Sequence, residues 1–242
     1  MVGADLSSRS TMKVLAGNAT FLQTIRVPNF GTNAVLWSLA NEFWYYMAFP
    51  PLLLLFFGKR PIWAKAAYLI LGALILTFVG TKIATLFLIW LLGFGVSITP
   101  LTIPERYRSL STIACLVQFI ALNAALRIHP IRMLTAEGLL GLSFALFLYS
   151  VVHARQPIGS MLYQHVATIF AKFSYTVYLV HLPFLTFVTA LIMMPWHAWP
   201  KNPAHLLAAL LLVVAAYAYA WILYLCFEKN TDQLRRWVTR LF

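Results

Sequence analysis

The chain has 242 residues, of which 62% are hydrophobic and only 10% are charged. Soluble domains are about one quarter charged and about half apolar, so a mean hydropathy of +0.81 excludes an ordinary water-soluble enzyme, a disordered chain and a nucleic-acid module. A net charge of +12 would suit a nucleic-acid partner. However, the basic residues stand singly between apolar runs, which is typical of membrane topology. We therefore expect the lipid bilayer as a partner, and no nucleic acid.

Seven apolar runs approach the length of about 20 residues that a helix needs to cross the bilayer. The sequence therefore predicts an all-α fold, a polytopic transmembrane helix bundle of about seven spans. The runs cover residues 34–57, 64–79, 83–98, 110–126, 134–152, 171–194 and 204–227. Only Gly80, Thr81 and Lys82 separate the second run from the third, which indicates a tight helical hairpin or one re-entrant segment. Pro183 lies inside the sixth run and predicts a kink.

The chain divides by composition into three parts. Residues 1–33 form a polar N-terminal segment, residues 34–228 the membrane domain, and residues 229–242 a basic tail. Eleven of the 18 Lys and Arg residues fall on the side that holds the C-terminus. The positive-inside rule then predicts a cytoplasmic C-terminus and an extracytoplasmic N-terminus for this chain. Cys115 and Cys226 lie inside apolar runs, so we expect neither a disulfide nor a metal site.

Glu42 is an acid about two turns inside the first span, where a carboxylate costs a few kcal/mol unless it is paired or faces a wet cavity. The side chains on or beside its helical face are Trp37, Ser38, Asn41, Tyr45 and Tyr46. One interpretation is an interhelical hydrogen bond that stabilises the bundle. The other is a functional site on this face.

A second polar cluster lies in the sixth span. Ser174, Tyr178 and His181 are spaced i, i+4 and i+7, so they share one helical face. A neutral imidazole can donate and accept a hydrogen bond at once, and it titrates near physiological pH. A buried histidine is often structural, but the two hydroxyls on its face and the adjacent Pro183 also suit a functional role.

These two clusters resemble sequence blocks of the acyltransferase 3 family of membrane acyltransferases. Members carry Trp-Ser-Leu-x-x-Glu-x-x-Phe-Tyr, and residues 37–46 read Trp-Ser-Leu-Ala-Asn-Glu-Phe-Trp-Tyr-Tyr, with Tyr45 in place of Phe. The family's late block, Ser-Tyr-x-x-Tyr-Leu-x-His-x-Pro-hydrophobic, is matched in full by residues 174–184. Residues 21–23 (Phe-Leu-Gln) and 228–229 (Glu-Lys) also look like the family. The resemblance extends over nearly the whole chain.

The resemblance implies a multipass enzyme of the inner (plasma) membrane. It would move an acyl group, commonly acetyl, from an acyl-CoA thioester to a hydroxyl of a carbohydrate or lipid-linked sugar. The acyl-CoA is a donor substrate, and no bound cofactor is expected. Glu42 and His181 are then the candidate catalytic residues. The candidate substrate-binding residues are Trp37, Ser38, Asn41, Tyr45, Tyr46, Ser174 and Tyr178.

The chain also departs from the family pattern. The family's first helix carries a histidine proposed as the general base, and nothing in this sequence corresponds to it. About three spans normally precede the block at residues 37–46, so we expect an N-terminally shortened member, which agrees with the exported N-terminus. Asn230 stands where the family usually has proline. The alternative is a non-enzymatic bundle remnant or a proton-coupled transporter that uses the acid and the histidine.

Overall fold

The computed structural model describes residues 3–57, 59–100, 103–152, 161–192 and 200–240. Within these ranges every extended regular element is helical, and the only β-type pairing is one isolated bridge between Gln23 and Val27, which confirms the all-α fold. The chain divides into two compact units, Met1–Glu42 with Gly159–Phe242, and Phe43–Ile158. We call them the α8–α9 unit and the α4–α7 unit. The boundary falls inside helix α3 (Leu36–Phe56).

The described residues include six helices that are long and apolar enough to cross a membrane. They are α4 (Ile62–Val79), α5 (Thr81–Ile98), α6 (Glu105–Ile128), α7 (Met133–Val152), α8 (Met161–Ile192) and α9 (Pro203–Cys226). Most of their apolar side chains are exposed, and α6 has no buried residue at all. Such a surface requires lipid rather than water around it, so the chain is a multipass membrane protein.

The first predicted span is also a helix. Helix α3 has 21 residues, but it contains the polar positions Asn41 and Glu42 and two prolines, Pro50 and Pro51. It is not among the six helices that are long and apolar enough to cross a membrane. The sixth predicted span begins earlier than expected, because α8 starts at Met161. Its two last predicted residues, 193 and 194, lie outside the described ranges.

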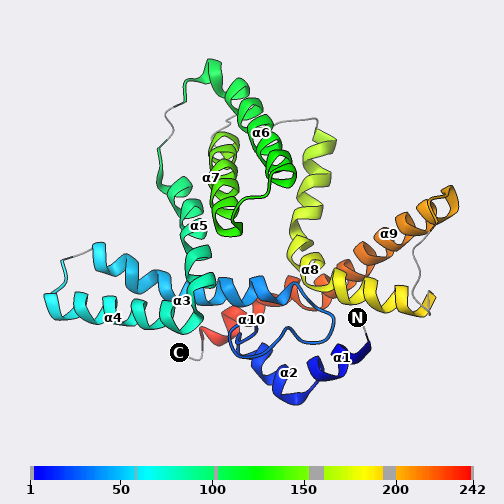
Figure 1. Cartoon of the computed structure of the whole chain (residues 1–242), viewed down its shortest axis with the longest axis horizontal. Helices are drawn as coiled ribbons and strands as arrows, with labels where there is room; N and C mark the ends of the chain where they lie inside the picture. Colours follow the sequence, from blue (N-terminus) through cyan, green and yellow to red (C-terminus); the bar gives the residue numbers. More distant parts are fainter. Residues whose placement is uncertain (1–2, 58, 101–102, 153–160, 193–199, 241–242) are drawn as a thin grey trace. The chain divides into compact units, whose positions relative to one another are not determined.

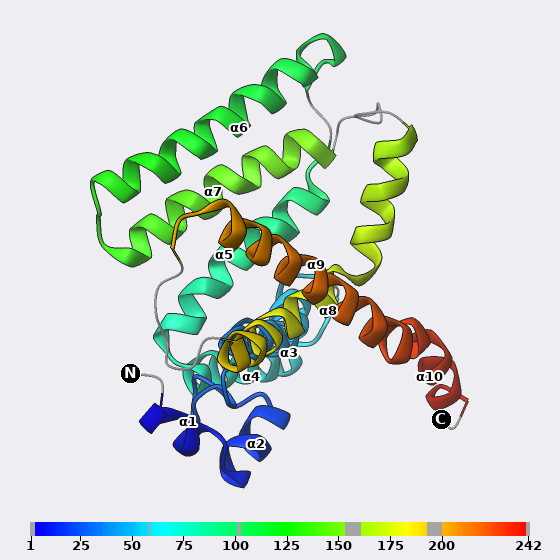
Figure 2. The ribbon, with the colours of Figure 1, turned by 90° about the vertical axis from the view of Figure 1, so that its right-hand side faces the viewer.

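The α4–α7 unit contains the second part of α3 and helices α4 to α7. A single residue, Gly80, separates α4 from α5, and its φ of 85° is a conformation that glycine adopts most easily. Figures 1 and 2 show that α5 leaves α4 in a new direction, whereas α6 and α7 lie side by side. Helix α7 also packs closely on α5, since a Cβ added at Gly141 would lie 2.5 Å from Cγ2 of Ile89.

The α8–α9 unit contains the start of α3, two short helices and the C-terminal elements. The elements not yet given are α1 (Gly3–Arg9), α2 (Met12–Ala19), η1 (Glu228–Asn230) and α10 (Thr231–Val238). Aromatic rings hold α8 against α9: Phe173 meets Trp221 edge-on with centroids 5.1 Å apart. Phe184 stacks on Tyr219 at 4.8 Å. These contacts position the face of α8 that carries the second polar cluster.

Residues 20–35 connect α2 to α3 as an ordered loop, so the N-terminal segment is more than a polar tail. Both polar atoms of the Asn18 side chain hold the loop. Its amide nitrogen donates to the carbonyl of Pro28 at 2.9 Å, and its oxygen accepts from the backbone amide of Phe30 at 3.1 Å. Gln23 is only 1% exposed and donates to the carbonyl of Leu36 at 2.9 Å. The loop therefore sets where α3 begins.

Candidate functional site

The two sequence blocks meet within the α8–α9 unit. The hydroxyl of Ser38 on α3 and the phenol of Tyr178 on α8 share a hydrogen bond. The phenol also donates to the carbonyl of Val35 at 3.4 Å. One residue of each predicted cluster therefore contacts the other cluster directly, although 140 positions separate them in the sequence.

A second link between the same elements follows from Pro183. A helical carbonyl normally accepts from the amide four residues later, but proline has no N–H, so the carbonyl of Leu179 loses its helical partner. The side-chain amide of Asn33 donates to this carbonyl at 2.9 Å. The loop before α3 thus supplies the donor that Pro183 lacks and fixes α8 against the start of α3.

The backbone around His181 determines which ring nitrogen carries the hydrogen. Its Nδ1 lies 3.0 Å from the carbonyl oxygen of Val177 and 2.8 Å from that of Tyr178. Both neighbours can only accept, so Nδ1 must be the donor, and in the neutral ring the lone pair is on Nε2. The histidine is half-buried, and this tautomer leaves Nε2 able to accept a proton.

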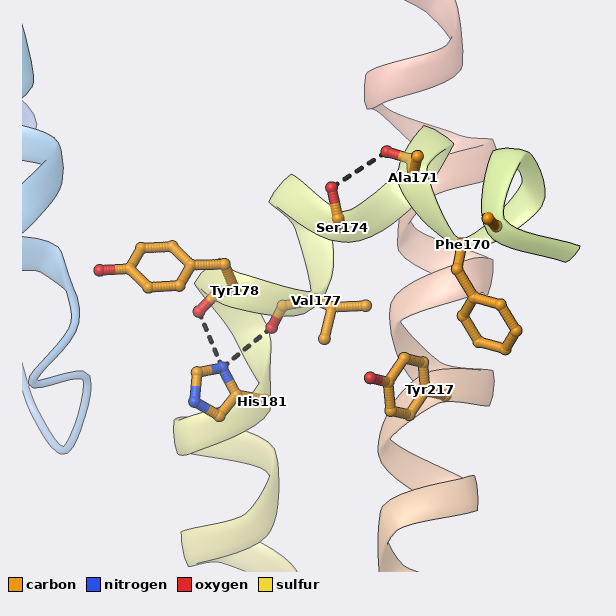
Figure 3. A pocket seen from close by; sticks show the side chains of 8 residues that line it. Phe170, Ala171, Ser174, Val177, Tyr178, His181 and Tyr217 are labelled. Atoms are coloured by element: carbon orange, nitrogen blue, oxygen red, sulfur yellow. Dashed lines mark hydrogen bonds between the residues drawn. The ribbon is translucent and has the colours of Figure 1, made fainter. Parts of the chain in front are cut away.

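An open groove of about 660 Å³ runs along this face of α8. Figure 3 shows its walls, with Ser174, Val177 and His181 on α8 and Tyr217 on the neighbouring helix α9. Tyr178 also lines the groove, but its ring points away from α9. The prediction that Ser174, Tyr178 and His181 share one face is therefore confirmed. The residues of the first cluster do not line this groove, and Ser38 adjoins it only through Tyr178.

Helix α8 changes direction near Ala171 and Ser174 (Figures 1 and 3). The hydroxyl of Ser174 donates to the carbonyl of Ala171 at 3.0 Å. Such serine bonds to the preceding turn compete with the backbone ladder and often bend helices. At Pro183, where the sequence predicts a kink, the amide of Asn33 replaces the missing donor.

Glu42 is half-buried and lies near a different part of α8. Its carboxylate is close enough to Tyr175 to act on it electrostatically, and so is the carboxylate of Glu228. The hydroxyl of Thr176 donates to Glu228. Glu42 and Glu228 therefore lie near the same residue of the late block, Tyr175.

The remaining candidates of the first cluster are divided by the boundary between the units. Trp37 is 45% exposed, and Asn41 is buried with its side-chain oxygen lacking a partner among the described residues. In the α4–α7 unit, the phenol of Tyr45 donates to the carbonyl of Ile83 at 3.2 Å. Tyr46 meets Trp90 edge-on at 5.9 Å. Both tyrosines are thus part of an aromatic cluster in that unit.

Tyr175, Thr176 and Tyr217 were not among the predicted site residues. Tyr175 and Thr176 lie inside the late block but on another face of the helix than His181. Their position inside that block was the only sequence signal that could have pointed to them. Tyr217 lies on α9, and only the packing of α9 on α8 brings it to the groove. No periodicity within one helix predicts that pairing.

Comparisons with protein-family models, with curated proteins and with solved structures found no match for this chain. Within the described ranges, no group of three or more His, Cys, Asp or Glu side chains could hold a metal ion.

Proposed function

We propose that this chain is a membrane-bound acyltransferase that moves an acyl group, commonly acetyl, from an acyl-CoA thioester to a hydroxyl of a cell-envelope carbohydrate or lipid-linked sugar. The resemblance of residues 37–46 and 174–184 to the acyltransferase 3 family supports the proposal. The observation that carries it is the cluster of Ser38, Tyr178 and His181, which joins the two blocks beside an open groove.

His181 is the general base in this proposal. Nε2 removes the proton of the acceptor hydroxyl as its oxygen attacks the thioester carbon. The carbon–sulfur bond then breaks, and the leaving thiolate takes the proton back from the imidazolium. The backbone carbonyls at Nδ1 favour this cycle, since they hold the ring in the tautomer that presents a lone pair at Nε2.

The hydroxyls near His181 suit the binding of a polyhydroxylated acceptor. Tyr178 and Ser174 line the groove, and Ser38 fixes the phenol of Tyr178. The hydroxyl hydrogens of Ser174 and Tyr178 go to the backbone carbonyls of Ala171 and Val35. Their oxygens can therefore accept hydrogen bonds from the hydroxyls of the acceptor. Glu42 lies near Tyr175 in the late block, and its proposed part is to hold acceptor hydroxyls.

The proposed location is the inner (plasma) membrane, with the C-terminus in the cytoplasm. The excess of Lys and Arg on the side of the C-terminus supports this orientation. It gives the basic tail access to the cytoplasm, where acyl-CoA is found, and directs the N-terminal segment to the outer side.

The proposal is tested by following label from radioactive acetyl-CoA into carbohydrate in membrane vesicles that contain the full chain. We expect incorporation with the wild-type chain and a loss of at least about 100-fold for His181→Gln, the range for a general base. Glu42→Gln should reduce transfer while membrane insertion stays intact. His205→Gln changes a half-buried histidine at the start of α9 that does not line the groove, so it is the matched control and should transfer normally.

Wild-type transfer by His181→Gln would refute the role of His181. The transport alternative predicts a different result in the same vesicles. A transporter would move its substrate across the bilayer unchanged, and no acetyl label would enter carbohydrate with any variant.

A further inference from the structure

A second pocket lies on the other side of α8 from the groove of His181, in the same unit. Its volume is about 770 Å³, and helices α8 and α9, η1 and the start of α10 form its walls. We propose that this pocket binds a phospholipid of the surrounding bilayer with a primary-amine head group, phosphatidylethanolamine. The inference depends on the multipass membrane fold and not on the acyltransferase proposal.

Most of the pocket wall is apolar. Leu179 and Val180 contribute from α8, and Leu223 and Phe227 from the end of α9. Phe227 is 71% exposed, although it lies directly after a membrane-spanning helix. An open apolar surface at this position is stabilised by contact with hydrocarbon, which removes it from water. An acyl chain is the ligand that a bilayer supplies to it.

The polar end of the pocket is acidic. The carboxylate of Glu228 lines it, and the hydroxyl of Thr176 orients that carboxylate by donating to it. Glu42 adds a second negative charge near this end, since both Glu42 and Glu228 act electrostatically on Tyr175, which also lines the pocket. A primary ammonium carries three N–H donors and one positive charge, so it can bond a carboxylate directly. The quaternary ammonium of a choline head group has no N–H to donate.

Basic residues follow the acid at once. Lys229 is the next residue after Glu228, and Arg235 lies one turn along α10 from Thr231, which lines the pocket. Arginine binds phosphate oxygens well. An acid that lines the pocket, followed in the sequence by bases that do not line it, matches a zwitterionic head group that has an ammonium and a phosphate. An anionic glycerol head group would meet the bases but leave Glu228 without a cation.

The test is native mass spectrometry of the full chain in detergent, with an equimolar mixture of phosphatidylethanolamine, phosphatidylcholine and phosphatidylglycerol of different acyl masses. We expect adducts of phosphatidylethanolamine to exceed those of each of the other two lipids roughly fivefold. This ratio corresponds to about 1 kcal/mol, the free energy of one ion pair. Glu228→Gln should remove this excess. Glu105→Gln, an exposed acid in the α4–α7 unit, should retain it. Equal binding of the three lipids, or an excess that survives Glu228→Gln, would overturn the proposal.

A second measurement uses the unaltered chain and so does not depend on the folding of a variant. Cys226 is exposed and lines the pocket, while Cys115 lies on α6 in the other unit. Phosphatidylethanolamine should slow the alkylation of Cys226 by a maleimide several-fold and leave Cys115 unchanged. Phosphatidylcholine should protect Cys226 less. Equal rates at Cys226 with both lipids would count against the site.

Discussion

The side-chain amide of Asn33 donates to the backbone carbonyl of Leu179 at 2.9 Å, across 146 positions of sequence. Pro183 explains why this carbonyl is open to a side chain, because it has no N–H to offer four residues later. In a membrane helix an unpaired carbonyl costs several kcal/mol, since the lipid cannot bond to it. The loop before α3 and the late block are therefore coupled by one hydrogen bond.

Asn33→Leu should lower the free energy of unfolding by roughly 1–3 kcal/mol, because it leaves the carbonyl of Leu179 unpaired. Pro183→Ala restores an N–H at the helical position. It should therefore stabilise the Asn33→Leu chain more than it stabilises the wild-type chain. The free energies of unfolding of the wild-type chain, the two single variants and the double variant in mixed SDS micelles measure this coupling. An equal effect of Pro183→Ala in both backgrounds would show that the two residues act independently.

The hydroxyl pair of Ser38 and Tyr178 is a second test of the contact between the two blocks. Tyr178→Phe removes its bonds to Ser38 and Val35 and should destabilise the chain by about 1 kcal/mol. Tyr217→Phe, in the same groove, is the matched control and should lower the stability less. Adding Ser38→Ala to Tyr178→Phe should cost less than Ser38→Ala alone, and strictly additive values would contradict the contact.

The sequence was sufficient to predict the helices, because an apolar run of bilayer length has few other folds available. It also predicted that Ser174, Tyr178 and His181 share a face, since helical periodicity fixes that relation within one element. The beginning of α8 at Met161 was not predicted, because residues 161–170 contain polar side chains that the apolar count excluded.

Relations between elements were harder to predict from this sequence. The bond of Thr176 to Glu228 joins positions 52 residues apart, and it depends on how α9 and η1 return to α8. Likewise, Asn33 was a loop residue with no periodic signal, and its role depends on Pro183, which the sequence analysis interpreted only as a source of a kink. A missing donor predicts that some other donor is needed, but not which residue supplies it.

The tautomer of His181 can be measured directly. Both oxygens at its Nδ1 are backbone acceptors, so we expect the neutral ring to carry its hydrogen on Nδ1 and the lone pair on Nε2. The ¹⁵N chemical shifts of labelled histidine in the full chain distinguish the two nitrogens, and His181→Gln assigns the signals. A neutral ring with its hydrogen on Nε2 would refute this assignment and the proposed base.

Gly80 is the single residue between α4 and α5, with φ 85° and ψ 164°. No atom lies within 4 Å of a Cβ built there, so the effect of a side chain is backbone strain alone. Gly80→Ala should therefore destabilise the chain by roughly 1–3 kcal/mol. Gly93→Ala, inside α5 and equally open, should be neutral or stabilising. Equal stability of the two variants would mean that the connection between α4 and α5 does not need glycine at position 80.

The close approach of α7 to α5 rests on Gly141, whose added Cβ would lie 2.5 Å from Cγ2 of Ile89. Isoleucine branches at Cβ, so Cγ2 can move only if the whole side chain changes its rotamer. Gly141→Ala should therefore destabilise the chain by roughly 1–3 kcal/mol. Gly138→Ala, one turn earlier on α7 with nothing within 4 Å, is the matched control and should be neutral or stabilising.

Ile89→Ala removes the atom that Gly141→Ala would meet. Alone, it should destabilise the chain by roughly 2–5 kcal/mol through the lost packing. In the double variant the alanine at position 141 has room, so the combined loss should be smaller than the sum of the single losses. Unfolding in mixed SDS micelles gives all four values. Additive losses would mean that α5 and α7 are not in contact at these residues in the membrane-embedded chain.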